Sequence, residues 1–329
     1  MGQFDPLARP ASPLPRFRQP VPIIWMSPAV KWILVLLFVA SAVYVHFRGR
    51  VRHRLGRQLL DHSTFMAPIN VLMYACSRVP TTPFLDPERH FPELAPLRAR
   101  WREIRAEARH LREMQQIKAA DGYTDVGFNS FFRRGWKRFY LKWYDDAHPS
   151  AAELCPATTA LLRGLPGVKA AMFTELPPGS ELRPHRDPYA GSLRLHLGLD
   201  TPNDDACFID VDGQRYSWRD GEWTMFDETY IHSARNDSTQ NRIILFCDIE
   251  RPMKYRWAAA LNRFVARNLI AAGASPNQEG DRTGGFNRAF KYFYALRLKS
   301  KALRERSKGL YYTLKYLGVA LVVALIIWI

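Results

Sequence analysis

The sequence predicts a mainly β jelly-roll (double-stranded β-helix) domain with flanking helices and a transmembrane helix near each terminus. Three observations predict this fold. Short segments of alternating apolar and polar residues follow one another between residues 170 and 249, and two of their turns carry Asp-Gly, at Asp212-Gly213 and Asp220-Gly221. Helical periodicity dominates the chain on both sides of this region. Two long apolar segments lie near the ends.

The alternating segments are short and closely spaced, which is typical of antiparallel sandwiches and jelly-rolls. They are Ala170–Leu176, Leu193–Leu199, Cys207–Val211, Gln214–Trp218, Trp223–Phe226, Tyr230–Ala234 and Ile243–Ile249. An aromatic block at Phe128–Tyr144 precedes them, and its second half also alternates like a strand. Helices are expected at Leu97–Glu113, Pro149–Leu162, Trp257–Ala272 and Phe286–Tyr316.

Composition excludes several classes of protein. The chain has 329 residues, and its 47 Lys+Arg against 31 Asp+Glu give a net charge of +16. Its hydrophobic content of 47% excludes a disordered chain, and one principal domain with appendages is expected. The 4 cysteines are scattered without a CxxC pair, which excludes a zinc ribbon or disulfide scaffold and favours a reducing compartment.

The basic excess clusters beside the apolar segments, so it indicates a membrane partner and no nucleic acid. Arginines 48, 50, 52, 54 and 57 follow the first segment, and six Lys or Arg residues between 297 and 308 precede the second. Each segment reaches the roughly 20 residues that span a bilayer when it is extended to Ala29 or Leu310. The flanking charges place residues 48–308 in the cytoplasm. A buried core helix, or for the first segment a secretory signal, is the alternative.

These patterns divide the chain into six parts. They are a disordered leader at 1–28 with Met26 as an alternative start, a transmembrane helix at 29–47, a membrane-proximal helical region at 48–121, the jelly-roll domain at 122–253, basic amphipathic helices at 254–309 and a second transmembrane helix at 310–329. The basic amphipathic helices are of a kind that lies on anionic membrane surfaces.

Candidate metal ligands lie in the predicted strands. His185 and Asp187 are two residues apart, so on a strand they would share a face, and His232 lies on a later strand. Two histidines and a carboxylate form the facial triad of non-haem Fe(II) oxygenases, which leaves three positions open. Arg242 could then pair with the far carboxylate of a chelating 2-oxoglutarate. Turn or core roles for the individual residues, or a metal-binding cupin, also fit these residues.

Longer motifs surround these residues. They are the stretch Phe173–Leu199 with its Arg-Pro-His-Arg-Asp-Pro core, Trp218–Glu222, Phe226–His232 and Asn241–Pro252. Together they resemble the aspartyl/asparaginyl β-hydroxylase family of Fe(II)/2-oxoglutarate dioxygenases, over about residues 122–253. Further matches, at Asp61–Phe65, Phe128–Phe132 and Asp145–Pro149, resemble the bacterial members that hydroxylate carbon 2 of a fatty acyl chain of lipid A.

The resemblance implies a role for each matching residue. His185, Asp187 and His232 match the catalytic iron ligands, and Arg242 matches the anchor of the distal 2-oxoglutarate carboxylate. Arg194 and His196 match residues that line the co-substrate near the metal, and Thr174 matches a hydroxyl that shares the distal carboxylate. The implied cofactor is Fe(II), with 2-oxoglutarate and dioxygen as co-substrates.

The resemblance also implies a substrate and a location. The substrate would be lipid A, an acylated and phosphorylated glycolipid, and the location the bacterial inner membrane with a cytoplasmic catalytic domain. The aromatic block could form an apolar channel whose Arg133, Arg134, Lys137 and Arg138 meet glucosamine phosphates, or it could be an edge hairpin with solvated charges. A membrane-tethered protein aspartyl/asparaginyl β-hydroxylase is the rival enzyme. A non-catalytic binding module would have no use for Arg242.

Overall fold

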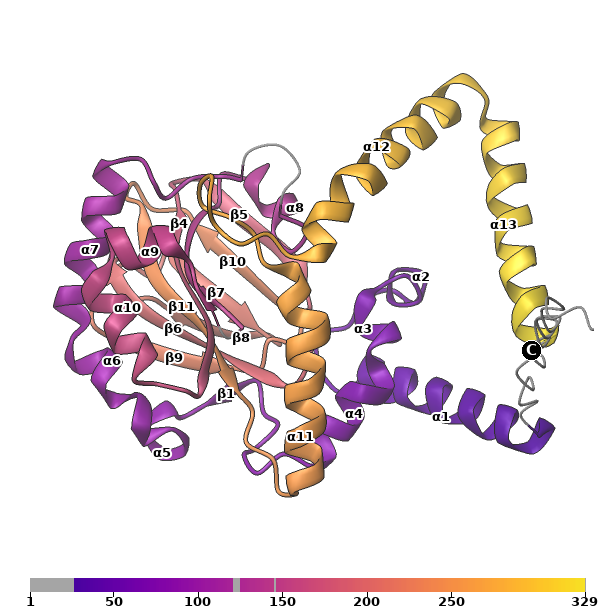
Figure 1. The fold of residues 1–329 in the computed structure, drawn as a ribbon, viewed down its shortest axis with the longest axis horizontal. Helices are drawn as coiled ribbons and strands as arrows, with labels where there is room; N and C mark the ends of the chain where they lie inside the picture. The colour runs from indigo at the N-terminus through magenta and orange to yellow at the C-terminus, as the bar shows by residue number, and fades with distance from the viewer. Residues whose placement is uncertain (1–26, 121–124, 145, 329) are drawn as a thin grey trace, which may run out of the picture.

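Two antiparallel sheets pack face to face at the centre of the computed structural model, which describes residues 27–120, 125–144 and 146–328 (Figure 1). The larger sheet has the order β1-β9-β6-β11-β4-β2-β3 and the smaller one the order β5-β10-β7-β8. The strands are β1 Phe84–Leu85, β2 Lys137–Trp143, β3 Asp146–Ala147, β4 Val168–Leu176, β5 Ser180–His185, β6 Ser192–Asp200, β7 Cys207–Val211, β8 Gln214–Ser217, β9 Trp223–Phe226, β10 His232–Asn236 and β11 Arg242–Glu250.

Strands β4 to β11 form a jelly-roll. They make two four-stranded layers, β9-β6-β11-β4 and β5-β10-β7-β8, which is the double-sheet arrangement of an eight-stranded jelly-roll. Each of the seven alternating segments contributes to one of these strands, which confirms the antiparallel β prediction. Strand β5 was not predicted, because it carries only one large apolar residue, Leu182, and contains Pro184.

Strict alternation along the central strands separates two apolar cores. In β11, Ile243, Leu245 and Cys247 pack under the outer helices, whereas Ile244 and Phe246 face the opposite sheet. The same parity turns residues 242 and 248 inward, together with residues 172 and 174 of β4 and residues 194 and 196 of β6. Polar side chains on this inner face are therefore buried inside the sandwich.

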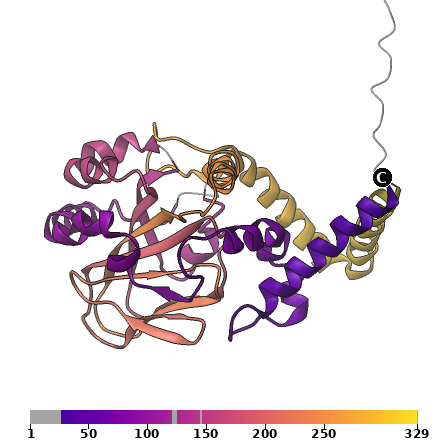
Figure 2. The same cartoon turned by 90° about the horizontal axis from the view of Figure 1, so that it is seen from below.

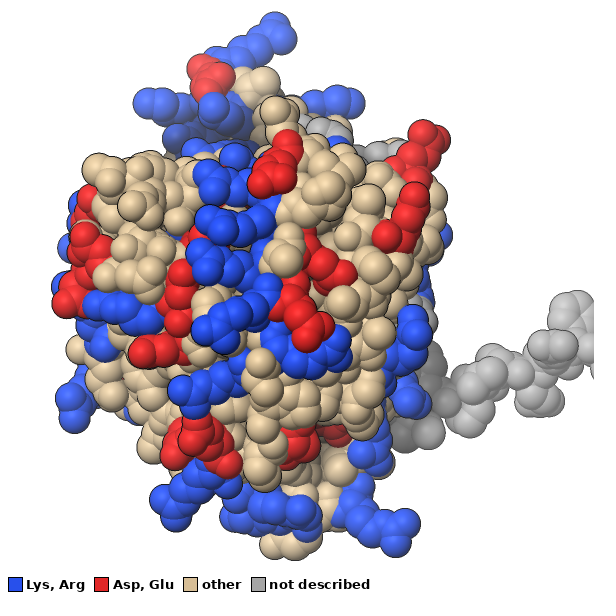
Figure 3. All heavy atoms as spheres, turned by 90° about the vertical axis from the view of Figure 1, so that its left-hand side faces the viewer, with Lys and Arg blue, Asp and Glu red and all other residues tan. Residues whose placement is uncertain are grey.

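Helices cover the outer face of the larger sheet (Figure 1). They are α6 Ala95–Ala99, α7 Trp101–Glu113, α9 Pro149–Leu154 and α10 Pro156–Arg163. In α7 the buried Ile104, Ala108 and Leu111 recur every three or four residues, as predicted for an amphipathic helix. The helix expected over Pro149–Leu162 is broken at Cys155, because Pro156 disfavours helical geometry in the residue before it. Lys and Arg form a band across this face of the molecule (Figure 3).

Three long helices, α1, α12 and α13, lie on one side of the sandwich (Figures 1 and 2). Helix α1 spans Pro28–Phe47, and α12 (Gly285–Arg306) leads into α13 (Lys308–Trp328). Among the described residues, α1 alone has the length and composition of a membrane-spanning helix. Helix α13 occupies the second predicted span except for residue 329, which lies outside the described residues, as does most of the predicted leader at 1–28.

Shorter helices connect these parts. They are α2 Leu55–Gln58, α3 His62–Phe65, α4 Ala67–Ala75, α5 Pro87–His90, α8 Asn129–Phe132 and α11 Arg256–Val265, with 3-10 turns at Pro92–Leu94 and Ala271–Gly273 and a π turn at Ala266–Ile270. The predicted helix over Trp257–Ala272 is therefore present, but beyond α11 it continues as a π turn and then a 3-10 turn.

The end of α1 is bound to the loops that precede β6 and β10. Arg48 pairs with Asp227 at 2.5 Å, and its guanidinium lies 3.9 Å from the ring centroids of both Tyr74 and Tyr230. Arg251 pairs with the same Asp227 oxygen at 2.8 Å. Burial opposes this charge, yet the two guanidinium groups lower the pKa of Asp227 well below its usual range. The carboxylate therefore joins α1 to the sandwich.

We expect Asp227→Asn to lower the free energy of unfolding by about 3–5 kcal/mol, because it leaves two buried guanidinium groups without their counter-charge. Thermal unfolding of the full chain in neutral detergent micelles measures the loss. Asp205→Asn is the control, since the Asp205 side chain is 83% exposed and water screens its pair with Arg219. Equal melting temperatures for the two variants would contradict the role of Asp227.

Candidate functional site

The three predicted metal ligands meet at one end of the sandwich. His185 ends β5, His232 begins β10, and the two residues are partners in the β5–β10 ladder. Asp187 follows β5, with an Oδ1 atom 3.7 Å from Nε2 of His185. One ligand atom from each of the three residues lies within 4.8 Å of the others. The sequence prediction that these residues come together is thus confirmed.

Asp187 reaches this cluster in a different way from the one predicted. Strand β5 ends at His185, so Asp187 does not share a strand face with it. The backbone N–H of Asp187 donates to the carbonyl of Glu228 at 2.9 Å, outside the ladder. The intervening Arg186 turns into the protein and donates to the carbonyl of Val45 at 2.9 Å, which draws this segment away from β10 toward α1. The carboxylate therefore approaches from a loop.

Hydrogen bonds to backbone carbonyls orient both imidazole rings. Nδ1 of His185 lies 2.7 Å from the carbonyl oxygen of Arg183, and Nδ1 of His232 lies 3.0 Å from that of Tyr230. Because a carbonyl only accepts, each Nδ1 carries the hydrogen and each Nε2 keeps a free lone pair. Burial lowers the pKa of both histidines, that of His232 to about 3, so both rings are neutral. Two neutral nitrogens and one carboxylate suit a divalent iron.

Arg194 serves Asp187 as a partner. It pairs with Asp187, with Asp248 at 2.8 Å and with Glu228 at 3.2 Å. Burial alone would raise the pKa of Asp187, but Arg194 and the two histidines lower it, whereas burial raises the pKa values of Glu228 and Asp248. Arg194 does line the cavity next to the triad, as predicted, yet its guanidinium is occupied by carboxylates. It holds Asp187 in place and keeps it ionised.

A narrow cavity runs from the triad into the sandwich, and four of the residues lining it carry buried polar atoms without partners. These atoms are Oγ1 of Thr174, both ring nitrogens of His196, Nε1 of Trp218, and Nε and Nη2 of Arg242. Burial lowers the pKa of Arg242 to about 10, and its guanidinium lies 4.5 Å over the ring of Trp218. Unpaired buried donors are costly, so this cluster fits an acidic ligand.

Sequence reasoning missed three contributors to the site. Asp248 and Glu228 are the other partners of Arg194, and Trp218 stacks on Arg242. Asp248 could have been predicted as a site residue from the sequence. It is a charged residue within an apolar strand, and it has the same parity as Arg242. Glu228 lies in a loop, where nothing in the alternation pattern marks it.

The aromatic block lies at the edge of the larger sheet and also contributes side chains to the inner cavity. Strands β2 and β3 form the edge of the larger sheet, while Phe128, Phe131 and Trp136 line the inner cavity. The ring of Phe131 lies 4.8 Å from that of His185. Three of the four basic residues predicted to meet phosphates are already in ion pairs within the protein, and one of these pairs joins Arg134 to Glu181. Arg138 is buried against Asp125 at 3.1 Å, and Lys137 lies 3.4 Å from Glu175.

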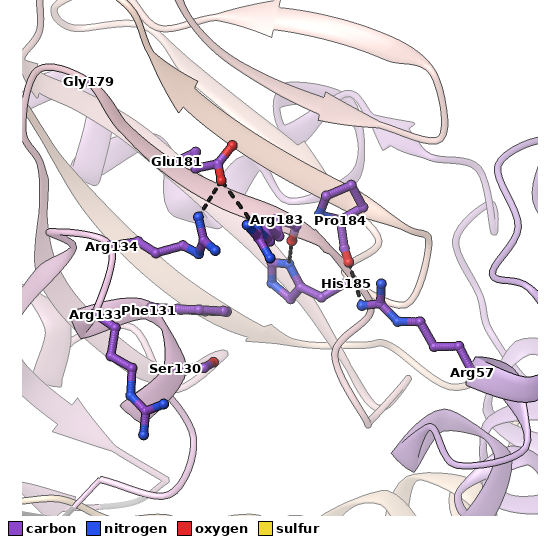
Figure 4. Close-up of a pocket in the computed structure, with 10 residues that line it drawn as sticks. All are labelled: Arg57, Ser130, Phe131, Arg133, Arg134, Gly179, Glu181, Arg183, Pro184 and His185. Carbon is purple, nitrogen blue, oxygen red and sulfur yellow. Dashed lines mark hydrogen bonds and ion pairs between the residues drawn. The ribbon is translucent and has the colours of Figure 1, made fainter.

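An outer groove of about 650 Å³ opens beside the triad (Figure 4). It shares Phe131 and His185 with the inner cavity, so the two spaces adjoin. We call it the arginine groove, because its lining includes Arg57, Arg133, Arg134 and Arg183. Arg133 and Arg134 were predicted to be near the substrate, whereas Arg57 and Arg183 come from segments far away in the sequence.

Comparisons with known proteins agree with this geometry. The family model described as aspartyl/asparaginyl beta-hydroxylase matches residues 98–252, which include every residue of the triad and the cavity cluster. An ornithine lipid ester-linked acyl 2-hydroxylase of Rhizobium tropici is 34% identical over 226 residues, which are 66% of this chain and 75% of that protein. The chain belongs to the aspartyl/asparaginyl β-hydroxylase family.

Two further proteins match with lower sequence identity. The human aspartyl/asparaginyl beta-hydroxylase is 27% identical over 122 residues, which are 36% of this chain and 16% of that protein. Among solved structures, a Pseudomonas putida prolyl-4-hydroxylase is 19% identical, covers 46% of this chain and 86% of its own, and has a TM-score of 0.34.

Arg194→Lys tests the positioning of Asp187. A lysine keeps the positive charge but cannot contact three carboxylates as a planar guanidinium does, so we expect a folded protein whose Co(II) affinity is about 10- to 100-fold lower. Calorimetric titration of the full chain with Co(II) measures this change. Arg219→Lys, in which an exposed ion pair with Asp205 is altered, should bind Co(II) like the unaltered chain. Unchanged affinity in Arg194→Lys would show that Asp187 needs no such partner.

Proposed function

We propose that this protein is an Fe(II)- and 2-oxoglutarate-dependent dioxygenase that hydroxylates carbon 2 of a fatty acyl chain of lipid A at the bacterial inner membrane. The observation that carries the dioxygenase assignment is Arg242, a buried guanidinium with two unpaired nitrogens in the cavity that adjoins the triad. In the reaction, one atom of dioxygen enters a substrate C–H bond. The other atom oxidises 2-oxoglutarate, which leaves as succinate and CO2.

The triad supplies the metal site. Nε2 of His185, Nε2 of His232 and the carboxylate of Asp187 would hold Fe(II), and the hydrogen bonds of both Nδ1 atoms keep the rings in the required tautomer. Bound Fe(II) and 2-oxoglutarate supply the activation of dioxygen and the removal of hydrogen from carbon. The protein side chains position the reactants, and this chemistry requires no protein acid or base.

The cluster of unpaired polar atoms supplies the co-substrate site. Nε and Nη2 of Arg242 would donate to the distal carboxylate of 2-oxoglutarate, and the hydroxyl of Thr174 would donate to the same group. His196 is the ladder partner of Phe246, which lies along β11 between Arg242 and Asp248, and it would contact the middle of the co-substrate. The ligand would thereby satisfy donors that are buried without partners.

An acyl substrate agrees with the rest of the cavity. Its lining is largely apolar, with Phe128, Phe131, Trp136, Leu182, Ile209 and Ala234. Such a surface accepts a hydrocarbon and excludes water from the reaction. The Rhizobium tropici relative is an acyl 2-hydroxylase, which supports an acyl lipid as the substrate class. Ornithine lipid is therefore a second candidate substrate, and a protein aspartyl or asparaginyl side chain is the alternative supported by the human relative.

The membrane helices agree with a lipid substrate. Helix α1 is apolar and exposed, and its end contacts the loop that carries Asp187 and the loop that precedes β10. Helix α13 would be a second span, with the basic residues of α12 on the cytoplasmic side. The catalytic domain would then face the cytoplasm, close to the inner leaflet.

Lipid analysis of cells tests the substrate. Lipid A from cells that carry the intact chain should gain the mass of one oxygen, and cells with His232→Ala should show no gain, because one metal ligand is lost. Ornithine lipids from the same cells are analysed in parallel. A gain in ornithine lipids alone would establish the second candidate, and no lipid gain with a folded, membrane-bound protein would favour a protein substrate.

Kinetics with 2-oxoglutarate test the role of Arg242. We expect Arg242→Gln to raise the KM for 2-oxoglutarate about 10- to 100-fold, because a charged hydrogen bond to the distal carboxylate is replaced by a neutral one. Co(II) affinity should stay unchanged, since Arg242 is not a triad residue. Succinate release at varied 2-oxoglutarate concentration gives the KM. A variant with lower kcat and an unaltered KM would contradict the assignment.

A further inference from the structure

The arginine groove carries positive charge that the acidic residues of its described lining do not fully neutralise. Glu181 is the acidic side chain in its lining, and it pairs with both Arg134 and Arg183, with the latter at 3.3 Å (Figure 4). Arg57 and Arg133 donate to neutral oxygens, namely the carbonyl of Pro184 at 2.8 Å and the hydroxyl of Tyr294 at 3.0 Å. Four arginines against one glutamate leave 4 − 1 = 3 positive charges at the entrance.

The groove lies where the head of a lipid substrate would be. It adjoins the inner cavity at His185 and Phe131, so a molecule with its acyl chain at the triad would extend its polar end among the arginines. Arg133 also lines a second pocket together with Arg297, Lys301 and Arg304 of α12. Basic residues therefore continue from the entrance onto α12. Helix α12 leads from the sandwich to α13 (Figure 1).

We infer that the arginine groove binds a phosphate group on the head of the lipid substrate. The inference rests on the proposed function, because it assumes that the acyl chain of the same molecule occupies the inner cavity. Guanidinium groups bind phosphate oxygens bidentately, and a phosphate monoester brings roughly 1.5 to 2 negative charges. That charge matches the uncompensated arginines better than a single carboxylate does.

The same groove disfavours a zwitterionic head. An ammonium group would need an acidic partner, and Glu181 is already paired with two guanidinium groups. The three uncompensated arginine charges would also repel an ammonium at this distance. The groove thus selects phosphorylated lipids over lipids whose head carries both a carboxylate and an amine.

Binding is measured with the full chain in neutral detergent micelles. Lipid A with its phosphates, or the same lipid after their removal, is added, and native mass spectrometry counts the bound lipid. We expect the unaltered chain to bind the phosphorylated form about 10- to 100-fold more tightly. The double variant Arg133→Gln, Arg183→Gln should bind both forms equally, because these exposed side chains would supply the contacts to phosphate.

Matched variants separate the groove from general charge effects. The double variant Arg133→Lys, Arg183→Lys keeps the charge and should restore part of the preference. Arg109→Gln removes an exposed arginine that pairs with Asp200 at 3.3 Å on the helix-covered face, and it should leave the preference intact. Equal binding of the two lipids by the unaltered chain would overturn the inference. So would an Arg109→Gln variant that loses the preference for phosphorylated lipid as fully as the double glutamine variant does.

Turnover and a phosphate competitor complete the test. If both lipids are bound equally and hydroxylated, the proposed function stands and the inferred phosphate site is rejected. If binding depends on phosphate but no acyl lipid is hydroxylated, the phosphate site stands and the proposed function is rejected. Inorganic phosphate is titrated against bound lipid A. Displacement only at millimolar phosphate supports a lipid head as the source, and displacement at micromolar phosphate would show that the groove is a site for free phosphate.

Discussion

The buried guanidinium of Arg194 is the contact on which the rest of the site depends. It lies on the inner face of β6 and pairs with Asp187, Glu228 and Asp248, which come from three different segments. Buried carboxylates without a counter-charge would be protonated, and a neutral Asp187 would be a poor metal ligand. The pairing therefore orders the loops that carry Asp187 and Glu228 and preserves the charge that a metal requires.

Strand alternation made much of the fold predictable. Cys207–Val211 and Trp223–Phe226 have the predicted bounds, because each is a clear alternating segment closed by a turn. Strand β5 has no such pattern and is held by its ladder with β10, which is a long-range contact. The triad was predictable from residue type and order, but the loop position of Asp187 depends on contacts of Arg186 with α1 that no local pattern records.

The inner face of the jelly-roll buries polar side chains and also leaves some of their polar atoms without hydrogen-bond partners. Thr174, His196 and Arg242 are buried like core residues, yet they keep polar atoms without partners. Such atoms reduce stability in the free protein and gain their hydrogen bonds only with a ligand. The parity of β4, β6 and β11 places these residues together in one cavity, and composition alone does not predict that arrangement.

Helix α1 is joined to the site by specific contacts. Arg186 donates to the carbonyl of Val45, and Arg48 pairs with the Asp227 carboxylate in the loop before His232. A shortened fragment that begins after Arg48 would lose both contacts and would expose the surfaces beneath them. Crystallisation or inhibitor screening with a water-soluble fragment therefore requires a start before Val45, with the apolar surface of α1 made polar by substitution instead of being deleted.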